Sequence, residues 1–294
     1  MKHPTRIGMM GIGLMGHGIA RNLLRHGHAL TLLAHPGNQP VEDLIAAGAR
    51  CAHTPAEVAR GAEVVLLCVT GSPQVEAVLL GDQGAVAALA PGAVVIDCST
   101  AMPESTRRMA DAVAAVGAHF IDAAMTRTPR EAAEGRLNLL VGGDAATVAR
   151  CMPLLRCFAE TITATGAVGS GHAMKLLHNY VSLGSLALLA EAAACAGQAG
   201  VDTRVLLDVL QQGGAAGVPL DRMRPYLIDG DTDGLRFAIA NAAKDLAYYT
   251  RMASEGDAWH RIADAVSQTL AQAVASGAGA RMMPELSDVL TRLK

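Results

Sequence analysis

The sequence has few aromatic residues and no long run of charge of one sign. Aromatic residues make up 3% of the 294 positions, whereas apolar residues make up 51%. The core must therefore consist mainly of aliphatic side chains, which suits helices packed on a parallel sheet. Lys and Arg number 24 against 27 Asp and Glu, for a net charge of −3. Electrostatics therefore do not draw this surface to nucleic acid or an anionic membrane, and we expect a small-molecule partner.

The six cysteines form no C-x-x-C pair, and no Cys, His and Asp cluster has the spacing of a zinc site. Thiols such as Cys68 lie in apolar, strand-like runs, which is typical of buried free cysteines in a reducing compartment. Glycines between positions 8 and 16 interrupt the N-terminal apolar stretch before it reaches signal-peptide length. Residues 181–197 fall short of the ~20 apolar residues of a membrane span and suggest a buried helix. We expect a cytoplasmic protein without a metal site or a membrane contact.

Short β-branched runs alternate with helical patterns from residue 5 to about residue 165, as in βαβ units. We expect strands at residues 6–10, 30–33, 64–69, 94–97, 119–122, 137–141 and 161–165. After the glycine-rich segment 166–171 the strand signals stop and helical spacing continues to Lys294. The sequence therefore predicts an α/β fold: a Rossmann-type, doubly wound parallel sheet in residues 1–166, then an all-α domain in residues 167–294. This second domain begins with a long interdomain helix.

A G-x-G-x-x-G motif directly follows the first expected strand and opens a helix. Its first glycine permits a tight turn, its second lets a pyrophosphate approach the backbone, and its third lets helix and strand pack closely. The amino end of the helix then faces the phosphates. The sequence therefore predicts a dinucleotide site. Its members are Gly11, Ile12, Gly13, Leu14, Met15 and Gly16.

The end of the second expected strand bears on the choice between NAD and NADP. An acidic residue in this region usually binds the ribose hydroxyls of NAD, but no acid occurs between Leu33 and Glu42. This absence favours NADP slightly, with His35 and Asn38 as candidate partners of the 2′-phosphate. The alternative that His35 is only a loop residue stays open, and the predicted cofactor is NAD(P).

Lys175 and Asn179 are four residues apart in a segment with helical spacing, so they project from one face of a helix. Interconverting an alcohol and a carbonyl moves a proton on the oxygen while a hydride moves at the carbon. A lysine whose pKa is lowered by burial or by a neighbouring cation can move that proton. We therefore predict Lys175 as the general acid and base, with Asn179 orienting it. The alternative is an ordinary Lys–Asn pair on the surface.

The segment from Gly169 to Asn179, GSGHAMKLLHN, resembles the catalytic helix of the β-hydroxyacid (3-hydroxyisobutyrate) dehydrogenase family, which includes 6-phosphogluconate dehydrogenase. Segments 11–16, 97–100, 137–143 and 244–246 also match that family, in order, so the resemblance covers almost the whole chain. It implies an NAD(P)-dependent oxidoreductase acting on the CH–OH group of a small, anionic β-hydroxyacid-type substrate. It also implies a homodimer or a homotetramer.

The resemblance implies roles for several further residues. Val69 and Thr70 stand where the family lines the nicotinamide pocket with a Leu-Pro pair, although Thr70 departs from the usual proline. Thr100 stands where a Ser or Thr contacts the cofactor, and Lys244 matches a C-terminal lysine that reaches back to the cofactor. His178 is expected to flank the substrate, as in the phosphogluconate branch.

The expected substrate loop departs from the family pattern. Most relatives read D-x-P-V-S-G-G, whereas this chain has Thr126, Arg127 and Thr128 in place of Ser-Gly-Gly. Thr126 can still supply a hydroxyl, and Arg127 adds a planar cation that can hold an anion through two hydrogen bonds. This loop resembles the sulfolactaldehyde reductase branch. The alternative is that Arg127 points to solvent or pairs with Glu131 or Glu134.

The candidate substrates are of the 3-hydroxyisobutyrate, tartronate semialdehyde, succinic semialdehyde and sulfolactaldehyde types. Two other functions remain open: an imine reductase-like enzyme, and a non-catalytic dinucleotide-binding sensor. Imine reductases characteristically lack the family lysine, so Lys175 argues against the first. Lys175, Asn179 and Lys244 together argue against the second. Asp245, beside Lys244, is expected to hold local structure.

Overall fold

The structure is a computed structural model that describes residues 4–293. The chain divides into two compact units, Met1–Lys175 and Leu176–Lys294. Two domains were predicted with a boundary at residue 166. The division into units falls a few residues later, inside the continuous helix α8 (Ser170–Gln198). The predicted boundary lies just before this helix, so the two divisions differ only in the unit to which the start of α8 is assigned.

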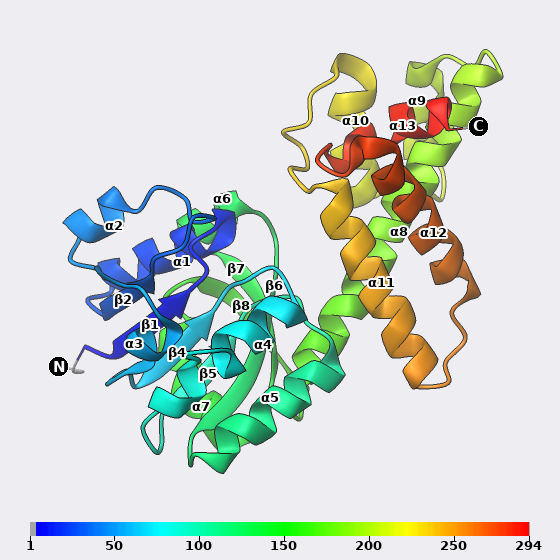
Figure 1. The fold of residues 1–294 in the computed structure, drawn as a ribbon. Coiled ribbons are helices and arrows are strands. Elements are labelled where there is room, and N and C mark those ends of the chain that lie inside the picture. The colour runs from blue at the N-terminus through cyan, green and yellow to red at the C-terminus, as the bar shows by residue number, and fades with distance from the viewer. Residues whose placement is uncertain (1–3, 294) are drawn as a thin grey trace. The chain divides into compact units, whose positions relative to one another are not determined.

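The first unit contains an eight-stranded sheet in the order β3-β2-β1-β4-β5-β6-β7-β8 (Figure 1). The strands are β1 (Arg6–Met10), β2 (Ala29–Leu33), β3 (Arg50–Ala52), β4 (Val64–Leu67), β5 (Val94–Asp97), β6 (His119–Thr126), β7 (Leu137–Gly142) and β8 (Ala159–Gly166). All seven predicted strands are present. The unpredicted β3 is a three-residue edge strand whose side chains are largely exposed, so it carries no apolar run.

The sheet is not parallel throughout. β6 and β7 are antiparallel, whereas β7 and β8 run parallel to each other. The prediction of a parallel sheet therefore holds for β1 to β6 and is wrong for the last two strands. The physical reason is the length of the connection, because residues 127–136 are too few for a parallel crossover, which needs about a dozen residues or more.

Helices cover both faces of the sheet and bury two aliphatic cores. The helices of this unit are α1 (Leu14–Arg25), α2 (Glu42–Ala46), α3 (Pro55–Ala59), α4 (Ser72–Leu80), the turn η1 (Ala85–Ala88), α5 (Pro103–Ala115), α6 (Pro129–Glu134) and α7 (Ala145–Leu155). Alternate strand residues enter opposite cores, as Ile96 and Val95 do. Helix α1 contributes Ile19 to the first core, and α5 contributes Met109 to the second. This doubly wound arrangement confirms the predicted fold class of the first unit.

The second unit is entirely helical, as predicted. Beyond the later part of α8 it contains α9 (Thr203–Gln212), α10 (Val218–Asp229), α11 (Ile239–Glu255), α12 (Arg261–Ala273), the turns η2 (Val274–Ala278) and η3 (Met283–Glu285), and α13 (Leu286–Arg292). Its core joins Leu186 of α8, Leu246 of α11 and Leu270 of α12.

Helix α8 is only half-buried along its apolar segment. Leu183 and Leu186 are buried, but Val181 and Leu188 are 66% and 62% exposed. The prediction of a buried helix is therefore wrong for one of its faces. By length and composition α8 also passes the test for a membrane-spanning helix, which core helices of soluble proteins pass as well.

Candidate active site

The cofactor residues predicted in the first unit follow the carboxyl ends of neighbouring parallel strands. The chain passes from β1 to β2 and β3 on one side and continues through β4, β5 and β6 on the other. The strand order therefore reverses between β1 and β4, which is where open α/β sheets bind ligands. The glycine motif follows β1, Val69 and Thr70 follow β4, and Thr100 follows β5. The structure thus places these segments at one edge of the sheet.

The geometry of the glycine motif fits a dinucleotide. Gly11 has φ +93, and a Cβ at this position would lie 2.2 Å from the carbonyl oxygen of Cys68. A Cβ on Gly16 would lie 2.0 Å from the carbonyl oxygen of Gly11, whereas one on Gly13 would meet no atom within 4 Å. Gly13 caps α1, which has no acidic residue in its first turn. The open space beside Gly13 and the amino end of α1 form a cradle suited to a pyrophosphate.

Asn38 has a structural role that the sequence did not reveal. Its Oδ1 accepts a hydrogen bond from the Ile12 amide at 3.2 Å, and its Nδ2 donates to the Leu33 carbonyl at 2.9 Å. Asn38 therefore ties the glycine loop to the end of β2. His35 is exposed, and its Nδ1 accepts a hydrogen bond from the Gly37 amide at 2.9 Å. Its role toward a 2′-phosphate stays a prediction.

The Val69 loop is held by two residues that the prediction missed. The Val69 amide donates to Ser99 Oγ at 3.0 Å, and the Ser99 amide donates to Asp97 Oδ1 at 2.9 Å. Asp97 is fully buried at the end of β5, and this burial raises the pKa of its carboxyl. A carboxylate at the end of an apolar strand was the available signal. Asp97 thereby fixes the segment that leads to Thr70 and Thr100.

Arg127 has a partner within its own unit. Its Nη1 donates to the carbonyl oxygen of Arg136 and forms an ion pair with Glu160 on β8. Its backbone has φ +79, in the left-handed region that favours glycine, and the resembling family has glycine at this position. The alternative in which Arg127 pairs with Glu131 or Glu134 is therefore wrong, because its ion-pair partner is Glu160. The substrate role of Arg127 stays a prediction, and Glu160 competes for its guanidinium.

Thr128 begins helix α6. Its backbone amide and its hydroxyl both donate to Glu131 Oε2, at 3.0 and 2.5 Å. The hydrogen bond from the Thr128 hydroxyl is the main cause that lowers the pKa of Glu131. These contacts give Thr128 a helix-capping role. Thr126, the last residue of β6, lies opposite Asn138 in the sheet and is partly exposed.

The buried amide of Asn179 is held on both sides. Its Nδ2 donates to Asp245 Oδ2 at 2.6 Å, and its Oδ1 lies 3.0 Å from His178 Nδ1. The ammonium of Lys244 lies 3.0 Å from Asp245 Oδ1 and 5.3 Å from the centre of the Tyr248 ring. Asp245 therefore holds local structure, as expected, and it fixes the orientation of Asn179.

Lys175 lies on α8 and is half-buried. Because α8 is continuous, the four-residue spacing places Lys175 and Asn179 on one helix face, as the pattern predicts. The contacts that Lys244 and His178 make toward a cofactor or a substrate stay predictions. Within the described chain, no group of three or more His, Cys, Asp or Glu side chains could hold a metal ion.

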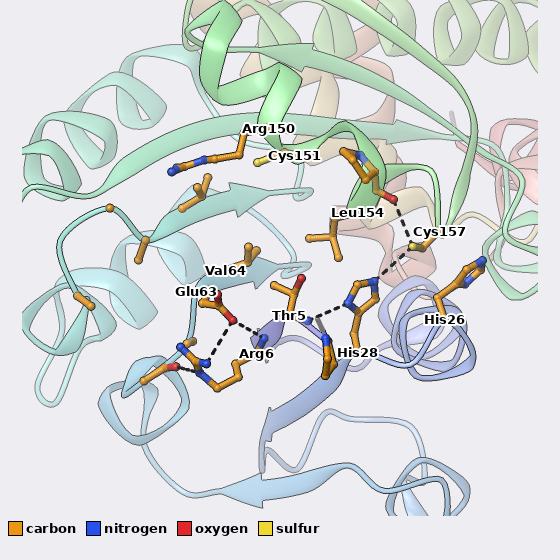
Figure 2. Close-up of a pocket in the computed structure, with 18 of the residues that line it drawn as sticks. Thr5, Arg6, His26, His28, Glu63, Val64, Arg150, Cys151, Leu154 and Cys157 are labelled. Atoms are coloured by element: carbon orange, nitrogen blue, oxygen red, sulfur yellow. Dashed lines mark hydrogen bonds and ion pairs between the residues drawn. The ribbon is translucent and has the colours of Figure 1, made fainter. Parts of the chain in front are cut away.

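A cavity of about 1020 Å³ lies at the opposite, amino edge of the sheet (Figure 2). It is lined by residues that begin strands, such as Arg6 and Val64. Figure 2 shows His28 between Thr5, whose amide donates to Nδ1 at 3.3 Å, and Cys157, whose Sγ lies 3.6 Å from Nε2. None of the predicted site residues lines this cavity, so it is separate from the cofactor loops.

The doubly wound sheet with its glycine cradle, followed by an all-helical unit, defines the class of two-domain dinucleotide-binding proteins. The family profile for the NAD binding domain of 6-phosphogluconate dehydrogenase matches residues 6–166. The profile described as NAD-binding of NADP-dependent 3-hydroxyisobutyrate dehydrogenase matches residues 169–289. The chain belongs to the β-hydroxyacid dehydrogenase family.

The relatives carry different names. A 3-hydroxyisobutyrate dehydrogenase of Pseudomonas aeruginosa is 34% identical over 224 residues, 76% of this chain and 74% of that protein. The cytokine-like nuclear factor N-PAC of Xenopus tropicalis is 29% identical over 278 residues, 90% of this chain. The chain spans about half the length of that relative (52%).

A solved structure shares the fold over nearly the whole chain. The crystal structure of a 3-hydroxyisobutyrate dehydrogenase from Salmonella typhimurium superposes with a TM-score of 0.85 at 25% identity. The match covers 97% of this chain and 99% of that one. This chain therefore shares its two-domain architecture with that 3-hydroxyisobutyrate dehydrogenase.

Proposed function

We propose that this chain is an NAD(P)-dependent oxidoreductase that interconverts a small hydroxyacid and its aldehyde or ketone. The observation that carries the proposal is the pairing of Lys175 and Asn179 on one face of α8, with the Asn179 amide fixed by Asp245. Family membership and the glycine cradle support it.

Each residue has a task in the proposed reaction. The amides at the start of α1 and the glycine loop hold the pyrophosphate, and bound NAD(P) supplies or accepts the hydride. Lys175 gives a proton to the substrate oxygen, or takes one from it, as carbonyl and alcohol interconvert. Asn179 has a second amide hydrogen beyond the one donated to Asp245. That hydrogen can bind the same oxygen and orient it toward Lys175.

We propose an anionic substrate of the 3-hydroxyisobutyrate, tartronate semialdehyde, succinic semialdehyde or sulfolactaldehyde type, with NADP slightly favoured over NAD. Thr126 and Arg127 at the end of β6 support an acid-binding role, provided that the substrate displaces Glu160 from the guanidinium. A cytoplasmic homodimer or homotetramer is part of the same proposal. The exposed apolar side chains of Val181 and Leu188 support self-association.

The sensor alternative has a specific observation in its favour, because relatives named as nuclear factors match this chain over 90% of its length. An activity screen separates the two proposals. The purified protein is incubated with NAD or NADP and a panel of C3 and C4 hydroxyacids, semialdehydes, sulfonates and a cyclic imine. We expect turnover of nicotinamide with at least one hydroxyacid or semialdehyde. Cofactor binding without turnover on any substrate would favour the sensor, and turnover on the imine alone would favour an imine reductase.

A further inference from the structure

Four fully buried polar side chains gather beneath the start of α8. They are Asp97 at the end of β5, Asp122 on β6, Thr106 on α5 and His172 on α8, each at most 1% exposed. Asp97 and Asp122 are register partners on neighbouring strands, so their side chains point to the same face of the sheet. Burying two carboxyl groups and an imidazole is costly unless they are paired or hydrogen-bonded. Hydrogen bonds and ion pairs within this cluster must therefore offset the cost of burying it.

Asp122 anchors the amino end of α8. Its Oδ1 accepts from the Gly169 amide at 2.7 Å, and its Oδ2 accepts from the His172 amide at 2.8 Å. A carboxylate at the amino end of a helix satisfies unpaired amides and complements the helix dipole. A Cβ on Gly171 would lie 2.8 Å from Asp122 Oδ2 and 2.4 Å from the Leu140 carbonyl. The first turn of α8 is thus packed directly against the sheet.

The His172 ring has one paired nitrogen and one nitrogen that faces Asp97. Its Nδ1 lies 2.7 Å from Thr106 Oγ1, and that hydroxyl is 3.0 Å from the Met102 carbonyl. The hydroxyl has a single hydrogen, so when it donates to Met102 its oxygen accepts from Nδ1–H of His172. The other ring nitrogen, Nε2, lies 3.9 Å from Asp97 Oδ2. Neither of these two atoms has a hydrogen-bond partner among residues 4–293.

The pair needs one proton between its two atoms. Two lone pairs facing each other in a fully buried site would leave both groups unsatisfied, which costs free energy. A proton on Asp97 Oδ2 or on His172 Nε2 removes this conflict and makes one group the donor. Burial raises the pKa of Asp97, which favours the neutral carboxylic acid donating toward Nε2.

We propose that Asp97 and His172 share one proton and act as positioning residues that hold the catalytic helix and the cofactor loop in a fixed arrangement. The proposal rests on the proposed oxidoreductase function. On one side, His172 precedes Lys175 by three residues on α8. On the other side, Asp97 Oδ1 accepts from Ser99, whose hydroxyl accepts from the Val69 amide. A single buried contact therefore joins the segment bearing the acid–base group to the segment expected to face the nicotinamide.

A matched pair of variants at Asp97 tests this. Asp97→Asn keeps an acceptor for the Ser99 amide and a donor for His172 Nε2, whereas Asp97→Leu removes both at similar volume. We expect Asp97→Asn to stay within a few-fold of wild type. Asp97→Leu should lower kcat roughly 10- to 100-fold, because small misplacements of catalytic groups cost up to about two orders of magnitude. The KM for the hydroxyacid should change much less.

Two controls separate positioning from loss of structure. In a Lys175→Ala background, Asp97→Leu should lower the residual rate by a smaller factor than it lowers kcat of the wild type, because part of its effect acts through Lys175. Thermal unfolding and cofactor titration report whether each variant is folded. Equal damage from Asp97→Asn and Asp97→Leu, or an undiminished kcat in Asp97→Leu, would overturn the proposal.

The shared proton is also tested without activity. In histidine-labelled wild-type protein, we expect nitrogen NMR to show a His172 Nε2 resonance shifted by the proton that it shares with Asp97, assigned to His172 by its absence in His172→Gln. It should keep this shift in Asp97→Asn and lose it in Asp97→Leu. If the wild type oxidises no substrate but shows this shifted resonance, the oxidoreductase proposal fails and the pairing stands. A His172 Nε2 resonance at the same position in wild type and Asp97→Leu would refute the pairing itself.

Discussion

Arg127 has a φ of +79, which is unusual for a non-glycine residue, and its guanidinium forms an ion pair with Glu160. An unfavourable backbone conformation of this kind costs about 1–3 kcal/mol and is commonest at functional positions. If Arg127 binds the acid group of the substrate, that group must compete with Glu160 for the guanidinium. The ion pair and the predicted substrate contact are therefore alternatives, and substitutions at the two positions should act in opposite directions.

We predict that Arg127→Ala lowers kcat/KM for anionic substrates, with a loss of transition-state stabilisation of about 2–4 kcal/mol. Glu160→Gln should raise kcat/KM a few-fold, since it removes the competitor. Arg127→Lys should recover only part, because a point charge cannot reproduce the planar two-bond contact. Steady-state kinetics on carboxylate, sulfonate and uncharged aldehydes of equal length measure each effect. Equal losses on charged and uncharged substrates would assign Arg127 to loop support.

Thr128 offers a contrast, because its visible contacts are structural. We predict that Thr128→Ala lowers the free energy of unfolding by about 1 kcal/mol, as loss of a helix cap does. The kcat/KM should be unchanged, and Thr128→Ser should restore stability because it keeps the hydroxyl. Denaturant unfolding and steady-state kinetics check the two parts. A fall in kcat/KM in a fully folded Thr128→Ala protein would show instead that Thr128 contributes to substrate binding or catalysis.

The same contact has a pH signature. The folded-state pKa of Glu131 lies below its ordinary value of 4.5, chiefly because of the Thr128 hydroxyl. The stability from this group is therefore present above pH 4.5 and is lost as pH falls through the lower folded pKa. In Thr128→Ala the loss of stability over this acid range should be smaller than in wild type.

At the scale of elements, the loop between β1 and α1 separates folding from cofactor binding. Gly11 has a positive φ and leaves no room for a Cβ beside the Cys68 carbonyl, whereas the space around Gly13 is open. We predict that Gly13→Ala unfolds within a few degrees of wild type but binds NAD(P) about tenfold more weakly, a loss of about 1.4 kcal/mol. Gly11→Ala should lower the unfolding temperature markedly. Calorimetry and thermal unfolding measure both. Unchanged cofactor affinity in Gly13→Ala would place the pyrophosphate elsewhere.

Patterns of neighbouring residues predicted the helices and strands whose signals are local. They failed where contacts between distant residues determine the structure. The glycine motif, for example, carries its signal within a few residues. The short edge strand β3 carries almost no apolar signal, and the direction of β7 depends on the length of a connection. The Asp97–His172 contact joins residues far apart in the sequence. Spacing along the chain could not reveal it.

At the scale of the whole molecule, cofactor choice follows from the missing acid after β2. We predict that the intact protein binds NADPH at least as tightly as NADH. Fluorescence titration of both reduced cofactors against the same preparation checks this. NADH binding tenfold tighter than NADPH would reverse the preference and return His35 to an ordinary loop residue.

The central claim is that Lys175 moves the proton in a hydride-transfer reaction. The most direct measurement compares nicotinamide turnover by wild type, Lys175→Ala and the control Met174→Ala, whose side chain is an exposed neighbour on α8. Cofactor affinity is measured in parallel. We predict that Lys175→Ala retains cofactor binding and loses roughly 10²–10⁴-fold in kcat, while Met174→Ala stays near wild type. Turnover by Lys175→Ala within a few-fold of wild type would contradict the account.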